Sequence, residues 1–360
     1  MLSSEKTWRG GEQQIAYLIS ELISFGTQVI VAAKSGSAFE KHCIENNLTL
    51  YSLPFRNGSD IYTASKINKI CKTESIDLVH AHSSKSHGIA VLGAMIGNRT
   101  PLILSRRVDF IPKNSLLTRW KYNHPAIKKI LCVSDKTKSI MQDYVSLPQT
   151  CVTIHSGIDL EKFQSDGNKK GLLRREYNIP DDHWIIGNTS ALEDHKDYFT
   201  FIDCIKVLVE RKIPCKALIF GEGSLRKKLG DYSIQSNMED HIVFTGFKKN
   251  IPEILPCLDF FLMTSKEEGL GTSVLDAFAS GVPVVATRAG GIPEMVVHEK
   301  TGLLAPIGNA VELSDCLTRL ISDDALRAAI IASAKQKVKE FSKEQMAFKT
   351  HQIYIDVLKG

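Results

Sequence analysis

Short apolar runs alternate with amphipathic stretches along most of the chain. In the first half, runs of β-branched and aliphatic residues bounded by polar or turn residues are typical of buried strands. These runs are Val29–Ala33, Leu48–Leu53, Leu78–Ala81, Leu102–Leu104 and Ile130–Val133. Between them, Glu12–Phe25 and Thr63–Thr73 carry apolar residues at helical spacing. This alternation predicts βαβ units around a parallel sheet.

The same pattern restarts after the polar stretch Ser165–Gly171. Its predicted strands are Trp184–Gly187, Ala217–Phe220, His241–Phe244, Phe260–Met263, Pro283–Ala286 and Gly302–Leu304. Its predicted helices are Tyr198–Arg211, Ser224–Leu229, Thr272–Ser280, Ala310–Ser322 and Asp324–Glu340. We therefore expect an α/β chain of two doubly wound domains, joined by a crossover over Ser156–Gln164. Such sheets bind ligands at the carboxyl ends of their strands, so a ligand held by both would lie in a cleft between them.

The beginning of the first domain departs from this scheme. Only Met1–Ser4 precede the loop Glu5–Gly11, whereas a doubly wound domain normally opens with a buried central strand. The first strand is therefore either very short or begins before the first residue given.

Composition adds that the chain is a globular protein of about two domains. The chain has 360 residues, and a domain has roughly 150. Hydrophobic residues make up 43% and charged residues 24%, which excludes a disordered, collagenous or disulfide-scaffold protein. No apolar run reaches the roughly 18 residues that span a bilayer, and the N-terminus lacks a signal-peptide core. The eight cysteines form no C-x-x-C pair, so we expect free thiols in a reducing, cytoplasmic environment.

Charge is distributed unevenly between the two halves. The net charge is +5, but residues 1–155 hold 19 Lys and Arg against 11 Asp and Glu, a balance of +8. This asymmetry favours an anionic partner for the first half, such as a membrane surface, a phosphorylated or acidic substrate, or nucleic acid. A solvated surface with no partner would have the same charge.

A glycine pair directly precedes the first amphipathic stretch. Residues 7–12 read TWRGGE, with the pair at Gly10 and Gly11. Paired glycines let backbone N–H groups approach a ligand closely, and a helix start adds positive partial charge. Both features favour a phosphate or another anion, although a tight turn without a ligand would use the same residues.

Two loops of the second half carry further candidate chemistry. Lys196 lies between a predicted strand and the helix that starts near Tyr198, where it is either a point charge for a leaving phosphate or a solvated surface lysine. Residues 265–278 read SKEEGLGTSVLDAF, a Gly-spaced loop that leads into a predicted helix. Free N–H groups there suit phosphate, and the carboxylates of Glu268 and Asp276 suit sugar hydroxyls. The alternative is that Glu268 is a surface residue and Asp276 supports the helix.

The spacing of these carboxylates resembles a known family. Glu268, seven intervening residues, Asp276 and then AFASGVPVVAT resemble the signature of glycosyltransferase family 4, the nucleotide-sugar-dependent, retaining enzymes of the GT-B fold. Further segments match in order and spacing, namely GGIPE at 290–294, TGLL at 301–304, GEGSL at 221–225, TGF at 245–247 and SGID at 156–159. The resemblance covers nearly the whole chain and is stronger over 245–304 than over the first half. WRGGEQQ at 8–14 is similar to a bacterial subgroup that assembles cell-surface polysaccharide or lipopolysaccharide.

This resemblance implies a GT-B fold, two doubly wound Rossmann-like domains facing across a cleft. Residues 1–155 with a returning C-terminal helix, 341–360, would form the acceptor domain, and 156–340 the donor domain. The implied reaction moves a hexose-type sugar from a nucleotide-diphosphate sugar of the UDP or GDP type to a glycan or lipid-linked acceptor. It implies no cofactor and no metal, and it places the protein in the cytoplasm or at the inner membrane face.

The resemblance also implies roles for individual residues. Gly10 and Gly11 would face the donor pyrophosphate and the acceptor, and Lys196 would stabilise the pyrophosphate. The sugar and its phosphates would be held by Glu268, Gly269, Leu270, Gly271 and Thr272, the ribose hydroxyls by Asp276, and the base by Phe247 and Lys248. On the acceptor side we expect Arg9, His82 and Arg107.

Three positions depart from the family pattern. The ribose-binding residue is usually Glu but is Asp276 here, one methylene shorter. The arginine usually paired with the pyrophosphate lysine falls at Ala191. The histidine after the fourth strand is replaced around Ser105–Arg107. We expect Arg106 or Arg107 to supply the missing charge, which makes Lys196, Glu268 and Arg106 the candidate catalytic set.

Two remaining features have a structural and a functional interpretation. His80 and His82 point the same way on a predicted strand, and with His87 they could bind a metal, but no acidic or thiol partner is near in sequence. We expect His82 to line the acceptor site and His80 to be packed.

Residues 113–124 combine Leu116, Leu117 and Trp120 with basic residues, which would suit an anionic membrane face. A helix that packs its apolar side on its own domain is the preferred interpretation.

Other functions fit the sequence less well. A non-catalytic GT-B protein that binds nucleotide-sugar or glycan is one alternative, because of Ala191 and Asp276. A non-hydrolysing nucleotide-sugar epimerase is another, although it lacks the Glu268-to-Asp276 pattern. A dinucleotide dehydrogenase is disfavoured because no Gly-x-Gly-x-x-Gly follows an early strand, and no nucleic-acid-binding motif accompanies the positive charge.

Overall fold

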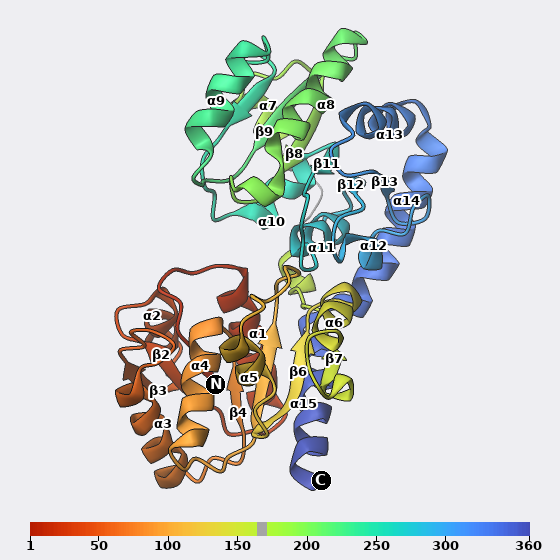
Figure 1. Cartoon of the computed structure of the whole chain (residues 1–360). Helices are drawn as coiled ribbons and strands as arrows, with labels where there is room; N and C mark the ends of the chain where they lie inside the picture. The colour runs from red at the N-terminus through yellow and green to blue at the C-terminus, as the bar shows by residue number, and fades with distance from the viewer. Residues whose placement is uncertain (164–170) are drawn as a thin grey trace. The chain divides into compact units, whose positions relative to one another are not determined.

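The computed structural model describes residues 1–163 and 171–360. These residues divide into two compact units, Met1–Gly157 with Lys343–Gly360, and Ile158–Ser342. The boundaries lie two residues beyond those expected from the sequence. Each unit is a parallel sheet covered by helices on both faces (Figure 1).

The first unit contains a seven-stranded sheet of order β3-β2-β1-β4-β5-β6-β7. Its strands are β1 (Leu2–Ser3), β2 (Ile30–Lys34), β3 (Thr49–Leu53), β4 (Val79–Ala81), β5 (Leu102–Arg106), β6 (Ile127–Cys132) and β7 (Cys151–Thr153). Its helices are α1 (Gly10–Ser24), α2 (Ala38–Glu45), α3 (Ile61–Thr73), α4 (Ser84–Met95), α5 (Leu116–Tyr122), α6 (Asp135–Gln142) and α15 (Lys343–Lys359). The central strand β1 has only two residues, yet it pairs with both β2 and β4.

Several helices of the first unit begin at a capping side chain. Ser37, Asp60, Ser83, Ser115 and Ser134 each accept a hydrogen bond from the N–H three residues further on. This bond satisfies a donor that the helix itself leaves free. The caps mark the starts of α2, α4 and α6, three helices for which the hydrophobic pattern gave no range.

The C-terminal helix α15 belongs to the first unit and completes one of its cores. Met346, Ala347 and Tyr354 pack in one buried cluster with Leu18 and Leu22 of α1 and with residues of β5 and β6. Gln14 of α1 holds Gly157, the last residue of the stretch Met1–Gly157. Its side-chain N–H donates to the Gly157 carbonyl at 2.7 Å, and its side-chain oxygen accepts from the Gly157 N–H at 2.8 Å.

The second unit contains a six-stranded sheet of order β10-β9-β8-β11-β12-β13. Its strands are β8 (Trp184–Asn188), β9 (Cys215–Ile219), β10 (Ile242–Phe244), β11 (Phe260–Met263), β12 (Val284–Thr287) and β13 (Leu303–Ala305). Its α-helices are α7 (Gly171–Glu176), α8 (Tyr198–Glu210), α9 (Arg226–Gln235), α10 (Ile251–Ile254), α11 (Thr272–Ala279), α12 (Ile292–Met295), α13 (Ala310–Ser322) and α14 (Asp324–Lys337). The predicted strands of this half are all found, within two residues at each end.

Both sheets reverse their strand order beside their first strand. In the first unit the chain builds β2 and β3 on one side of β1 and places β4 on the other. In the second unit it builds β9 and β10 on one side of β8 and places β11 on the other. Ligands of open α/β sheets bind at such switch points, so the loops after β1, β4, β8 and β11 are where a site is expected.

The helix expected over residues 113–124 is present as α5, but its orientation differs from the preferred interpretation. Leu116, Leu117 and Trp120 are exposed, whereas Tyr122 is buried. The expectation that α5 packs its apolar side on its own domain is therefore wrong. Among the described helices, none is long and apolar enough to cross a bilayer.

Candidate functional site

In the second unit, Lys196 and Glu268 form an ion pair at the switch point. Lys196 ends the short 3-10 helix Asp194–Lys196 after β8, and Glu268 lies in the loop after the neighbouring strand β11. The Lys196 Nζ donates a hydrogen bond to Glu268 Oε2, and the two side chains are only 15% and 13% exposed. Two residues predicted separately from sequence are thus in direct contact.

Backbone bonds hold the two loops of this pair against each other. The Lys266 N–H donates to the His195 carbonyl at 2.8 Å, and Thr264 Oγ1 donates to the Asp197 carbonyl at 2.9 Å. The Gly291 N–H donates to the Glu268 carbonyl at 2.9 Å. Ser265 Oγ contacts the Glu268 carboxylate at 3.3 Å. The bonds to backbone carbonyls position the loops without using the charges of the pair, and Ser265 adds a direct contact to the Glu268 carboxylate.

The helix α11 starts beside Glu268. Its N-cap is Gly271, whose φ of 94° favours glycine, and no side chain caps the helix. A Cβ on Gly271 would lie 3.2 Å from Glu268 Cγ, so the loop passes close to the carboxylate. Uncapped N–H groups of a first turn attract anions. Gly269, Leu270 and Thr272 belong to this loop and first turn, as predicted from the sequence pattern.

Asp276 lies in the second turn of α11. Burial raises the pKa of its carboxyl to about 7, and the positive charge of Lys162 partly opposes this shift. Among the described residues, none donates a hydrogen bond to this carboxylate. It is therefore a half-buried acceptor that receives no hydrogen bond from the described part of the chain, which suits a ligand hydroxyl.

Phe247 and Lys248, the residues expected beside the base, differ in their surroundings. Phe247 follows Gly246, which has a φ of 75°, and its ring is 70% exposed. Lys248 is paired with Glu176 of α7 at 3.1 Å, and this carboxylate raises the pKa of the lysine. Phe247 is thus available for stacking, whereas Lys248 contacts its own unit.

A second glycine loop supports Lys196 and was not predicted as part of the site. A Cβ on Gly221 would lie 2.1 Å from the Ser190 carbonyl oxygen, and one on Gly223 would lie 2.4 Å from that of Leu192. Only glycine lets the loop after β9 pack on the loop that leads to Lys196. The spacing of GEG at 221–223 is the sequence signal for this contact.

In the first unit, Gly10 and Gly11 form the first turn of α1 rather than a separate turn. A Cβ at either position would meet no atom within 4 Å, and neither residue has a positive φ. Packing and backbone conformation therefore do not require glycine here. The N-cap of α1 is Arg9, an exposed residue whose N–H donates to Glu12 Oε2 at 3.1 Å. Gly10 and Gly11 have no side chains to cover the first N–H groups of α1, although Glu12 places a carboxylate in the same turn.

His82 and His80 are both buried in a hydrogen-bonded cluster at the end of β4. His80 is bonded through Nδ1 to the Tyr354 hydroxyl at 2.5 Å and through Nε2 to Ser105 Oγ at 2.8 Å. Ser105 Oγ lies 3.3 Å from His82 Nδ1. Burial, together with the nearby Arg107, lowers the pKa of both histidines well below the usual value. His80 is thus part of a polar network and not simply packed.

The rings of His80 and His82 lie 3.8 Å apart between their centres, whereas His87 has other partners. His87 lies in α4, where its Nε2 bonds to the Lys121 carbonyl at 3.2 Å and its ring contacts Tyr122. Burial lowers the pKa of His87 to about 3.

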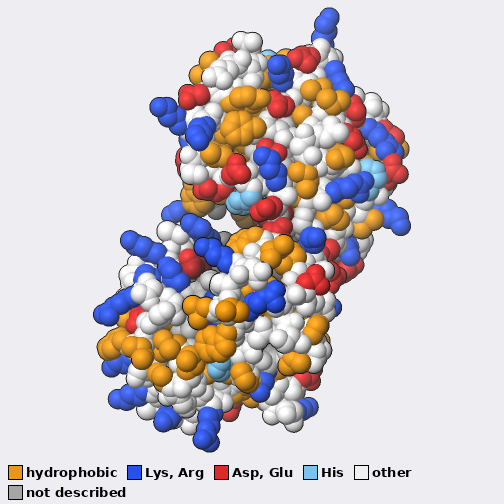
Figure 2. All heavy atoms as spheres, viewed as in Figure 1, with side chains coloured by type: hydrophobic (Ala, Val, Ile, Leu, Met, Phe, Trp, Pro, Cys, Tyr) orange, Lys and Arg blue, Asp and Glu red, His pale blue; other side chains and the backbone are white. Residues whose placement is uncertain are grey.

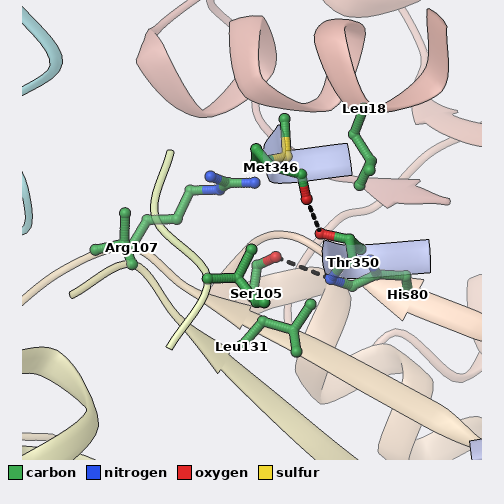
Figure 3. A pocket seen from close by; sticks show the side chains of 9 residues that line it. Leu18, His80, Ser105, Arg107, Leu131, Met346 and Thr350 are labelled. Atoms are coloured by element: carbon green, nitrogen blue, oxygen red, sulfur yellow. Dashed lines mark hydrogen bonds between the residues drawn. The ribbon is translucent and has the colours of Figure 1, made fainter. Parts of the chain in front are cut away.

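Arg106 and Arg107 have different surroundings. The Arg106 guanidinium donates to the Tyr122 hydroxyl at 3.3 Å and to the Phe110 carbonyl, and it lies 4.7 Å from the centre of the Phe110 ring. Arg107 lines a small pocket with His80, Ser105 and Met346 (Figure 3). Burial lowers the pKa of Arg107 to about 10, and the charge of Glu12 in α1 opposes this shift. Glu12, which sequence reasoning did not single out, therefore connects Arg107 to the α1 start.

Comparisons with known proteins cover both units. The family model described as Glycosyltransferase Family 4 matches residues 8–162, and that described as Glycosyl transferases group 1 matches residues 169–337. The chain is 27% identical over 310 residues to N-acetyl-alpha-D-glucosaminyl L-malate synthase of Bacillus anthracis, covering 83% of this chain and 80% of that protein. It is 24% identical over 312 residues to UDP-Gal:alpha-D-GlcNAc-diphosphoundecaprenol alpha-1,3-galactosyltransferase of Escherichia coli, again covering 83% and 80%.

A solved structure has the same fold over the full length. Alr3699/HepE of Anabaena, crystallised in complex with UDP and glucose, superposes with a TM-score of 0.84 at 18% identity and covers 99% of each chain. The arrangement of two parallel sheets of seven and six strands is thus the GT-B fold.

Proposed function

Because the chain belongs to the group 1 glycosyltransferases, we propose that it transfers a sugar from a nucleotide-diphosphate sugar to an acceptor hydroxyl with retention of configuration. The donor is of the UDP or GDP type and binds to the second unit. The acceptor is a glycan or a lipid-linked glycan and binds to the first unit. The product serves cell-surface polysaccharide or lipopolysaccharide biosynthesis at the cytoplasmic side of the membrane.

The Lys196–Glu268 pair at the β8/β11 switch point carries this proposal. A cation, a carboxylate and the uncapped start of α11 lie together there. A donor presents the complementary groups, an anionic diphosphate and a sugar with hydroxyl donors. Diphosphate binding draws Lys196 Nζ toward phosphate oxygens, which leaves the Glu268 oxygens to accept hydrogen bonds from the sugar.

The same groups stabilise the leaving group. When the bond between the anomeric carbon and oxygen breaks, negative charge develops on the β-phosphate. Lys196 and the N–H groups of α11 are positioned before the reaction and stabilise this charge electrostatically. These protein groups supply positive charge to the diphosphate, and we propose that no metal ion or other cofactor takes part.

Retention follows from attack on the same face that the phosphate leaves. The family resemblance supports this stereochemistry, with the departing phosphate oxygen accepting the acceptor proton. Proton NMR of the first-formed product tests it directly. An α-linked donor should give an α-linked product, and a β-linked product would exclude the retaining mechanism.

In the second unit, Asp276 is proposed to accept hydrogen bonds from the ribose, and the Phe247 ring to stack on the base. In the first unit, the open first turn of α1 at Gly10 and Gly11 is proposed to receive phosphate or acceptor oxygens, with Arg9, His82 and Arg107 on the acceptor side.

Arg106 is already bonded to Tyr122 and Phe110. Of the two arginines, Arg107 has a counter-charge, Glu12, in the helix that starts at Gly10.

The named relatives support a saccharide or lipid-linked acceptor. The Escherichia coli relative acts on a diphosphoundecaprenol-linked sugar, as its name states. Such acceptors carry a diphosphate, which is consistent with the balance of +8 over residues 1–155. We therefore place a diphosphate-bearing acceptor first among the acceptors to be tried.

The proposal is tested by a ligand screen followed by product analysis. UDP, GDP, ADP and their sugars are added to the purified chain, and the midpoint of thermal unfolding is measured. A ligand that binds only the native state raises this midpoint with the logarithm of its concentration. We expect one nucleotide class to do so and its sugar to be transferred. Stabilisation without transfer to any acceptor would favour a binding protein, and conversion of the sugar without an acceptor would favour an epimerase.

A matched pair of variants locates the donor. Lys196→Ala should abolish most of the stabilisation by the active nucleotide, because the diphosphate loses its cation. Lys216→Ala removes the same charge from the same unit at a half-buried position of β9, where the ammonium bonds to the Asp240 carbonyl, and should leave the stabilisation unchanged. Equal stabilisation of wild type and Lys196→Ala would place the diphosphate elsewhere.

A further inference from the structure

An exposed apolar surface surrounds α5 in the first unit. Leu116 is 89% exposed, more than any other large hydrophobic residue in the described part of the chain, and Leu117 and Ile111 are each 73% exposed. We define the α5 patch by its six exposed members, Val108, Phe110, Ile111, Leu116, Leu117 and Trp120. Figure 2 shows hydrophobic side chains gathered on the face of the first unit where α5 lies in Figure 1, with Lys and Arg side chains around them.

The apolar and basic residues of α5 occupy adjacent strips. Leu116 and Leu117 lie four and three residues before Trp120, so these side chains share one face of the helix. Arg119 and Lys121 flank this face, and the buried Tyr122 lies opposite. A surface helix normally turns its apolar face to the core. Here the polar and aromatic residue Tyr122 anchors the helix and the aliphatic face points outward.

The patch is held in place by specific contacts. Arg106 bonds to the Phe110 carbonyl, and the Tyr144 hydroxyl donates to the Lys113 carbonyl at 2.9 Å. Ser115 caps α5 through the Thr118 N–H. The exposed side chains therefore extend from a fixed backbone, and an apolar surface that is held exposed indicates a partner.

We propose that the α5 patch docks the first unit on an anionic phospholipid surface. Between residues 108 and 124 the basic residues are Lys113, Arg119 and Lys121, against the single acid Asp109. Aliphatic side chains that enter the headgroup boundary, a tryptophan at the interface and flanking cations together bind anionic bilayers. A second copy of this chain fits less well, because a symmetric contact would bring Lys113, Arg119 and Lys121 against their own equivalents.

This inference rests on the proposed function in one respect: docking would bring the first unit to a lipid-linked acceptor. Docking itself needs neither donor nor acceptor. It can therefore be measured separately from sugar transfer.

The test is flotation of the full chain with vesicles. Vesicles of phosphatidylcholine alone are compared with vesicles in which roughly one third of the lipid is phosphatidylglycerol. We expect binding to the anionic vesicles, weakened by salt, and an emission blue shift that is lost in Trp120→Phe. Leu116→Ser with Leu117→Ser should lower the bound fraction at least about tenfold. Lys113→Gln with Arg119→Gln should remove the preference for anionic lipid.

Matched controls carry the same changes elsewhere. Ile44→Ser with Ile234→Ser alters two residues that are 64% and 60% exposed, and Lys227→Gln with Lys228→Gln removes two exposed charges from α9. Both controls should bind vesicles like wild type. Equal loss in a control, or equal binding to neutral vesicles, would overturn the proposal.

Two further readouts separate the remaining explanations. Sedimentation without lipid that shows a dimer in wild type and a monomer in the Leu116/Leu117 variant would overturn the proposal in favour of a second copy. Thermal stabilisation by the active nucleotide, measured on every variant, shows that the variants are folded. If that stabilisation is present and vesicles do not bind, docking fails alone; if vesicles bind and no nucleotide does, the proposed function fails alone.

Discussion

The Lys196–Glu268 ion pair neutralises two side chains that, in the proposed function, contact the donor as separate charges. Both are largely buried, and the two loops that carry them are fixed by backbone bonds. Pairing therefore avoids an isolated buried charge on either side chain. In the proposed function, the donor replaces this pair with phosphate and hydroxyl contacts of its own.

A substitution at Glu268 separates binding of the sugar from binding of the nucleotide. Glu268→Gln keeps the shape but weakens the acceptor for sugar hydroxyls. We expect kcat/KM for the intact donor to fall about 10- to 100-fold, the usual effect of losing a charged hydrogen-bond partner. The dissociation constant of the free nucleoside diphosphate, measured by calorimetry, should change little. An equal loss for both ligands would show that Glu268 does not act through the sugar.

Asp276 gives a second prediction, on stability against pH. Its folded pKa of about 7 lies above that of an unfolded Asp, near 4, so the native state binds more protons than the unfolded state between these values. Stability is therefore present at low pH and falls as the pH rises from about 4 to about 7. Asp276→Asn removes this penalty and should stabilise the second unit at pH 8 by about 2 kcal/mol, after allowance for solvent screening of a half-buried group.

The measurement is urea unfolding of wild type and Asp276→Asn at pH 5 and pH 8. The gain from the substitution should be larger at pH 8. A gain that is the same at both pH values would mean that the carboxyl is not perturbed. Because an ionised Asp276 is the better acceptor for ribose hydroxyls, nucleotide affinity of the wild type should rise over the same pH range.

Among the elements, the glycine loop after β9 sets the position of Lys196. Gly221→Ala would place a Cβ 2.1 Å from the Ser190 carbonyl, so one of the two loops has to move. We expect the second unit to lose about 3 kcal/mol, as in other overpacked sites, and sugar transfer to fall with it. Gly171→Ala is the control, because nothing lies within 4 Å of a Cβ there. Wild-type stability in Gly221→Ala would show that the two loops are not in firm contact.

Elements buried on both faces were predictable from the sequence. The inner strands β11 and β12 read as nearly continuous apolar runs, because parallel strands covered by helices have no polar face. The edge strand β7 and the short helix α2 were missed, since part of each is exposed and their residues lack a clear period. For α5 the helical spacing was predicted correctly, but the apolar face points to solvent and not to the core. An apolar strip shows that a face is hydrophobic, not whether the protein itself covers it.

The candidate site was predictable as separate residues but not as contacts. Family spacing singled out Lys196, Glu268 and Asp276. Their contacts depend on strand order, which brings loops 72 residues apart into hydrogen-bond distance. The His80–Tyr354 bond spans 274 residues and depends on the return of α15 to the first unit. No local pattern contains that information.

For the whole molecule, the two units should respond to acid in opposite directions. The first unit buries His80, His82 and His87 with lowered pKa values. Below pH 6.5 its unfolded state binds more protons than its native state, so its stability falls as the pH falls, by at most about 1.4 kcal/mol per histidine and pH unit. The second unit, in contrast, becomes more stable as the pH falls, because Asp276 is then protonated.

Calorimetry from pH 7.5 to pH 5 tests this. We expect the unfolding of the first unit to move to lower temperature relative to that of the second. Trp184 is the tryptophan of the second unit, whereas Trp8 and Trp120 belong to the first. Tryptophan fluorescence of Trp184→Phe therefore follows the first unit alone and assigns the transitions. A first-unit transition that stays fixed from pH 7 to pH 5 would contradict buried neutral histidines.

The helix α15 leaves the ribosome only after the whole second unit has been made, yet it closes a core whose other members were made early. Leu18 and Leu22 leave the exit tunnel long before Met346 and Tyr354. During translation the second unit therefore emerges whole and can fold, while the first unit waits with an uncovered side. An apolar surface of the first unit therefore stays uncovered during synthesis until α15 has emerged and packed on α1.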